Sequence, residues 1–113
     1  MRDGYIGYKR EGVIMELEKD IEKYFKDKIK QAGGRSMKWV CPGVRGVPDQ
    51  IVFFPNGKSV LVEMKRPTGS LRKLQEKTAN KLRELNQQVY ACYTKCQADR
   101  LVQDFTERGY FDA

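Results

Sequence analysis

The sequence predicts a single α/β domain over residues 1–113, a central mixed β-sheet flanked by helices, in the order α-β-β-β-α-β-α. Apolar residues recur at three- and four-residue steps from about 13 to 32, which is typical of an amphipathic helix. Two short apolar runs flank Asn56-Gly57, a strong hairpin signal. A helical pattern then precedes a further apolar run, and a helix between strands suits a crossover connection, so we expect a mixed sheet.

Glycine and proline residues mark the ends of the expected helices and strands. Gly33-Gly34 ends the first helix, and Pro67-Thr68-Gly69 ends the third strand. Residues 1–12 are rich in glycine and charge, so we expect a mobile N-terminal arm. The expected elements are a helix at 13–32, strands at 37–40, 49–54 and 59–65, a helix at 70–86, a strand at 89–93 and a helix at 98–108.

Composition indicates the kind of partner. The chain has 22 Lys and Arg against 15 Asp and Glu, and this net charge of +7 favours polyanionic partners, of which nucleic acid is the commonest. The alternative is a basic but otherwise ordinary solvated surface. The three cysteines are odd in number and lack paired spacing, which favours a reducing compartment. There is no run of 18 apolar residues and no apolar signal core, so we expect a cytoplasmic protein without a membrane partner.

The third strand carries an unusual pair of charges. Alternation places Glu63 and Lys65 on one face of this strand, and Val60, Val62 and Met64 on the other. Charged side chains are rare on inner strands unless they are paired or functional. The alternative is an exposed Glu-Lys strand with no role in chemistry.

The hairpin folds Asp49, at the start of its first strand, back beside Glu63, although the register is open at this stage. Two carboxylates and the Met64 backbone carbonyl would suit Mg²⁺ or Mn²⁺, which prefer oxygen ligands. Such an ion polarises a phosphate and lowers the pKa of bound water. Lys65 would orient that water or stabilise the developing charge. The chain has no histidine, so hydrolytic chemistry has to use such groups.

This spacing, Pro48-Asp49 followed by Glu63-Met64-Lys65, resembles the PD-(D/E)xK nuclease superfamily. More of the chain is similar to one branch of it, the VRR-Nuc family. The similar segments are LEKDIEKYFKDKIKQAGG, CPGVRGVPDQIVF, VLVEMKRPTG, LRKLQ and VYACYT. The resemblance spans about residues 14–105 and implies a restriction-endonuclease-like fold and an Mg²⁺- or Mn²⁺-dependent DNA endonuclease.

The resemblance also implies residues outside the hairpin. Glu18 matches a metal-binding glutamate of the first helix, and Glu22, one turn later, is the alternative. Gln75 matches a glutamine that faces the active site, and we count it with the catalytic residues. Arg72 stands where the family's Leu-Ser-x-x-Gln pattern has serine, so we expect it to contact a phosphate instead.

The resemblance further implies branched DNA as substrate. Free bacterial and phage members of the family are similar to Holliday-junction resolvases, which implies a homodimer acting in a bacterial cell or a phage-infected host. The loop 43–46 would let its backbone approach DNA closely. The expected DNA-binding residues are Arg45, Lys38, Arg66, Arg72 and Lys73. The alternatives are a catalytically idle DNA-binding protein that keeps the fold and a structural subunit that docks an acidic protein.

Overall fold

The computed structural model describes residues 9–10, 13–14, 17–64 and 69–113. The helices are α1 (Glu18–Ala32), α2 (Gly69–Glu84) and α3 (Lys95–Glu107). The strands are β1 (Lys9–Arg10), β2 (Val13–Ile14), β3 (Arg35–Lys38), β4 (Gln50–Phe53), β5 (Ser59–Glu63) and β6 (Val89–Ala91). None of the helices in this described part is long and apolar enough to cross a membrane.

The main sheet has four strands in the order β3-β4-β5-β6. β3, β4 and β5 are antiparallel neighbours, whereas β6 returns parallel to β5 after the α2 crossover. The Asn56-Gly57 turn closes the β4–β5 hairpin: the Asn56 side chain accepts the Lys58 N–H at 2.9 Å, and Gly57 has a φ of 92°. The predicted α/β fold with a mixed sheet is confirmed.

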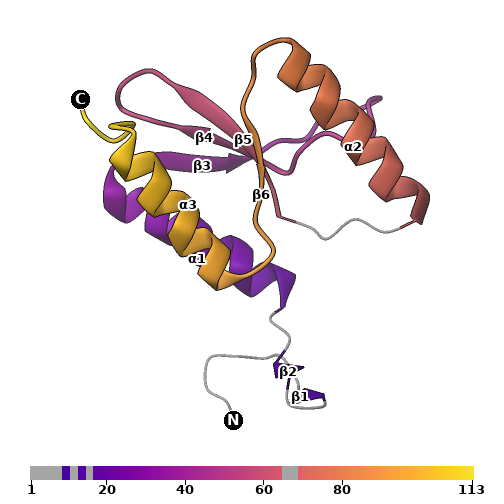
Figure 1. Ribbon diagram of the computed structural model, residues 1–113, viewed down its shortest axis with the longest axis horizontal. Helices are drawn as coiled ribbons and strands as arrows, with labels where there is room; N and C mark the ends of the chain where they lie inside the picture. The colour runs from indigo at the N-terminus through magenta and orange to yellow at the C-terminus, as the bar shows by residue number, and fades with distance from the viewer. Residues whose placement is uncertain (1–8, 11–12, 15–16, 65–68) are drawn as a thin grey trace.

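Helices cover both faces of this sheet. α1 and α3 lie side by side and pack on one face, where Phe25, Val62 and Phe105 are fully buried (Figure 1). On the other face Leu61 packs with Ala79 of α2. Neighbouring residues of β5 therefore enter opposite cores, as the alternation predicted. Val60, Val62 and Met64 all lie in the core beneath α1 and α3.

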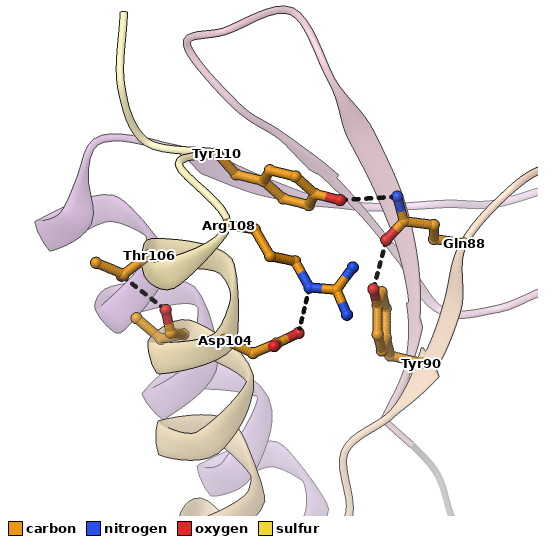
Figure 2. Close-up of polar contacts among 7 residues, drawn as sticks. Gln88, Tyr90, Asp104, Thr106, Arg108 and Tyr110 are labelled. Atoms are coloured by element: carbon orange, nitrogen blue, oxygen red, sulfur yellow. Dashed lines mark hydrogen bonds and ion pairs between the residues drawn. The ribbon is translucent and has the colours of Figure 1, made fainter.

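The end of α3 is tied to the strand at the edge of the sheet. Figure 2 shows Gln88 between two tyrosines: its amide donates to the Tyr110 hydroxyl at 2.9 Å and its carbonyl oxygen accepts from Tyr90. Arg108 is held by an ion pair to Asp104 at 3.0 Å. The Gln88–Tyr110 hydrogen bond therefore ties the start of β6 to the C-terminal segment on the α3 side of the sheet.

The starts of α1 and α3 differ most from those predicted. α1 starts at Glu18 rather than near 13, because residues 13–14 pair as β2 with β1 and Leu17 is still extended at φ −77° and ψ 142°. α3 starts at Lys95 rather than 98, because the Thr94 hydroxyl caps it by accepting the Gln97 N–H at 3.0 Å. The remainder of the predicted arm, residues 1–8 and 11–12, lies outside the described residues.

Candidate active site

The β4–β5 register decides where Asp49 lies. Gln50 pairs with Val62, so Asp49 comes next to Glu63 at the same end of the hairpin. Its Oδ2 accepts the Met64 N–H at 2.9 Å, and its backbone carbonyl accepts the Trp39 N–H at 2.8 Å. The Asp49 carboxylate is therefore held at the end of β5 beside Glu63, where the hairpin prediction placed it, and its backbone is held on the β3 side.

The Glu63 carboxylate lies in a poorly solvated position. Its side chain is only 8% exposed, and its backbone carbonyl accepts the Cys92 N–H at 2.8 Å, which carries the sheet on toward β6. Burial raises the pKa of Glu63 above its ordinary value, and the Asp49 charge raises it further, whereas the Arg83 guanidinium opposes the change. A carboxylate whose charge is disfavoured by burial and by a neighbouring carboxylate marks a position where a bound cation is favourable.

Gln75 of α2 lies in the same groove as Glu63. This groove, between α2 and the strand edge at β5 and β6, has a volume of about 600 Å³. The Gln75 side chain is 5% exposed, and its Oε1 has no hydrogen-bond partner among the described residues. Buried acceptors are normally paired, so an unpaired acceptor beside a carboxylate indicates a position for a ligand or an ordered water.

The remaining predicted metal ligands are not brought together. Glu18 is exposed in the first turn of α1, and Glu22 makes an ion pair with Lys38 at 3.7 Å. Within residues 17–64 and 69–113 no three Asp, Glu or Cys side chains converge closely enough to hold a metal. Mg²⁺ commonly binds through one or two protein carboxylates, with water and substrate phosphate completing its shell. Asp49 and Glu63 fit that kind of site, and Glu18 stays a prediction.

Three predicted site residues follow one another at the end of β5. Lys65 and Arg66 lie outside the described residues, so their predicted roles stay predictions. Met64 is buried at 2% exposure and its N–H holds Asp49. Its carbonyl stays a predicted ligand.

The predicted DNA-binding residues are spread over several surfaces. Arg72 lines the α2–β6 groove, where it pairs with Glu76 at 3.2 Å. Lys38 lies elsewhere, in a groove beside α1. Arg45 and Lys73 are exposed, on the 43–46 loop and on α2.

The glycines of the 43–46 loop differ from each other. A Cβ built on Gly43 would meet nothing within 4 Å, as expected for a backbone open to substrate. Gly46 instead packs against α2, and a Cβ there would lie 2.9 Å from Leu74 Cγ. The expectation of an open loop therefore fails at Gly46, whose small size lets the chain pass close to α2 just before Asp49.

Sequence reasoning missed Arg83, which lines the groove together with Glu63 and Gln75. The signal was present in the spacing. Gln75, Ala79 and Arg83 follow one another at four-residue steps and so share one face of α2. Because Gln75 was predicted to face the active site, Arg83 on the same face of α2 could have been predicted to lie there as well.

The mixed sheet, its helical layers and the carboxylate pair at the end of the hairpin define a restriction-endonuclease-like α/β domain. The profile of the VRR-NUC domain matches residues 16–96, and the chain belongs to that family. A solved structure described as a VRR_NUC domain superposes with a TM-score of 0.69 at 26% identity, covering 78% of this chain and 96% of that one.

One curated relative comes from a phage. "Putative nuclease p44" of Acyrthosiphon pisum secondary endosymbiont phage 1 is 48% identical over 50 residues. The match covers 44% of this chain and 54% of that protein, so this chain spans about half the length of the curated relative. The family predicted from the sequence motifs is confirmed.

Proposed function

We propose that this protein is a nuclease that hydrolyses phosphodiester bonds of DNA with Mg²⁺ or Mn²⁺. The observation that carries the proposal is the pair Asp49 and Glu63, held side by side by the β4–β5 register in a member of the VRR-NUC family. The relative named as a nuclease supports the same activity. The Asp49 and Glu63 carboxylates would hold the ion, with the Met64 carbonyl and Glu18 as further ligands. When bound, the ion supplies charge neutralisation at the phosphate and a more acidic water.

The protein's own groups then position the reactants. The Gln75 Oε1 lies in the groove beside Glu63 without a described partner, and it would accept a hydrogen bond from the attacking water. Lys65 follows Glu63 by two positions, and its ammonium would stabilise the charge that develops on the phosphate oxygens. Both roles depend on groups that act beside the carboxylate pair rather than on a nucleophilic side chain.

We further propose that the substrate is branched DNA and that the active form is a homodimer. Symmetric cutting of a four-way junction requires two active sites related by a two-fold axis. The net charge of +7 on 113 residues supports a densely charged polyanion as partner. Arg45, Arg66 and Lys73 would add phosphate contacts. The proposed setting is the cytoplasm of a bacterium or a phage-infected cell.

Cleavage of synthetic four-way junctions, flaps and linear duplex, each with Mg²⁺, Mn²⁺ or EDTA, tests the proposal. We expect metal-dependent cutting that is fastest on the junction and is abolished by Glu63→Gln. Glu84→Gln is the matched control, because it removes an exposed carboxylate at the end of α2. No product with either metal would reject the nuclease, and equal cutting of all three substrates would reject junction selectivity. A monomeric mass in sedimentation with junction DNA would reject the homodimer.

A second candidate is a DNA-binding protein that keeps the fold without catalysis. It is favoured by the observation that the described residues bring no third acidic side chain to Asp49 and Glu63. This candidate predicts salt-sensitive junction binding that is unchanged in Glu63→Gln, together with the absence of metal-dependent product. The same set of assays therefore separates the two functions.

A further inference from the structure

The groove that contains Glu63 and Gln75 continues along α2 to Arg83. α2 forms one wall and β6 the other. Arg83 reaches from the first wall to the second: its Nη2 donates to the Val89 carbonyl at 2.9 Å, and its Nη1 donates to Asn80 Oδ1 at 3.2 Å. These two hydrogen bonds hold the guanidinium of this otherwise exposed residue across the groove.

Arg83 differs from the other groove arginine in the kind of partner that it contacts. Arg72 pairs with the Glu76 carboxylate, whereas the hydrogen-bond partners of Arg83 in the described residues are a neutral amide and a backbone carbonyl. A guanidinium carries five N–H donors in one plane, and these two hydrogen bonds use one N–H of Nη1 and one of Nη2. The remaining donors suit the oxygens of a phosphate, which guanidinium groups bind in a forked arrangement.

The parallel β5–β6 register sets the distance from the carboxylates. Leu61 pairs with Val89, and Glu63 pairs with Ala91. Because Arg83 binds the Val89 carbonyl, it is anchored two residues along the strands from the Glu63–Ala91 pair. Two residues of a strand span about 6–7 Å. This separation is of the order of one nucleotide step along a DNA backbone. A strand whose scissile phosphate lies at Asp49 and Glu63 would bring its neighbouring phosphate to Arg83.

We propose that the α2–β6 groove binds the DNA strand on one side of the scissile bond and that Arg83 holds the adjacent phosphate. The inference rests on the proposed function, since that function places the scissile phosphate at the carboxylate pair. The groove also holds a buried acceptor suited to a ligand or water: Gln75 is 5% exposed, and its Oε1 has no partner among the described residues. Arg83 binds substrate and takes no part in bond breaking.

Equilibrium binding of a fluorescent junction and a fluorescent duplex in EDTA tests this, because no cleavage intervenes. We expect Arg83→Ala and Arg83→Gln to raise the Kd about tenfold or more. The slope of log K against log salt should become shallower by about one contact. Arg83→Lys keeps the charge and should retain most of the affinity. Arg100→Ala removes an exposed arginine from α3 and is the matched control, with an expected Kd near that of the wild type.

A single methylphosphonate in the labelled strand identifies the contact. Placed one nucleotide from the cut, this neutral linkage should weaken binding of the wild type, yet leave binding of Arg83→Gln unchanged. Thermal unfolding of each variant shows whether it is folded, and Arg83→Gln with Arg83→Lys decides the case if Arg83→Ala unfolds. The inference is overturned if the folded Arg83 variants bind as Arg100→Ala does, with the wild-type salt slope.

The two proposals fail in different ways. Cleavage that depends on Glu63, combined with binding indifferent to Arg83, rejects the groove and leaves the nuclease intact. Binding that depends on Arg83 without any metal-dependent product supports the groove as a DNA site and rejects catalysis.

Discussion

Replacing Gly46 with alanine perturbs the point where the loop before Asp49 crosses α2. Gly46 has a φ of +86°, and an added Cβ would lie 2.9 Å from Leu74 Cγ and 3.1 Å from both the Leu74 carbonyl and Thr78 Oγ1. Gly43 provides a matched control within the same loop. Its φ is +84°, but its Cβ would meet nothing within 4 Å. The two substitutions therefore share the backbone strain and differ in the collision.

The magnitudes follow from this difference. A left-handed conformation costs an L-residue about 1–2 kcal/mol, which applies to both Gly43→Ala and Gly46→Ala. Forcing an extra methyl group into a packed contact costs about 1–3 kcal/mol more, which applies to Gly46→Ala alone. Because one of the close atoms is a backbone carbonyl of α2, rotation of the Leu74 side chain cannot relieve the whole contact. We expect a loss of stability of about 1–2 kcal/mol for Gly43→Ala and of about 2–5 kcal/mol for Gly46→Ala.

Urea unfolding measures both values, with the fluorescence of Trp39 as the signal. The chain contains 1 tryptophan, and it packs beside the Leu61 and Ala79 core, so it reports on the layer that α2 covers. The free energy of unfolding follows from linear extrapolation. Equal destabilisation by the two substitutions would refute the reasoning, because it would mean that Gly46 is required for its φ alone and that α2 does not limit the loop.

Three further predictions address the site and its support. The raised pKa of Glu63 means that the stability of the metal-free protein falls as pH rises through that pKa, so Glu63→Gln should stabilise the metal-free protein at neutral pH. Mn²⁺ should raise the Tm of the wild type far more than that of the variant, and equal shifts would contradict Glu63 as a metal ligand. Thr94→Ala should cost about 1 kcal/mol in urea unfolding through loss of the α3 cap, whereas Thr94→Ser should cost much less. Phe105→Ala should cost about 3–5 kcal/mol, since its ring is fully buried against Phe54, and a loss below about 1 kcal/mol would argue against that core.

Much of the site can be read from local sequence because its geometry is local. Two-residue alternation assigns Glu63 and Val62 to opposite faces of β5 in any sheet, and both faces are found as expected. The Asn56-Gly57 turn limits how β4 can fold back on β5, which brings Asp49 toward Glu63. Strand alternation and hairpin turns involve few residues at short separation, so no distant part of the chain overrides them.

The start of α1 shows where local patterns fail. Apolar residues follow helical spacing from residue 13 onward, yet residues 13–14 form β2 because their backbone pairs with β1. Periodicity records which side chains are apolar, and it does not record which backbone hydrogen bonds compete for the same residues.

Hydrophobic periodicity and the Asn-Gly turn were thus enough to predict the α/β fold, and the Asp49, Glu63 and Lys65 spacing together with the further similar segments was enough to predict the family. The packing of α2 against the rest of the chain was needed for the other features. It makes Gly46 a contact rather than an open hinge, buries Gln75 beside Glu63 and carries Arg83 across to Val89. These features depend on where a helix lies relative to a loop and a strand distant in sequence. That placement results from the packing of many side chains together, which no single segment encodes.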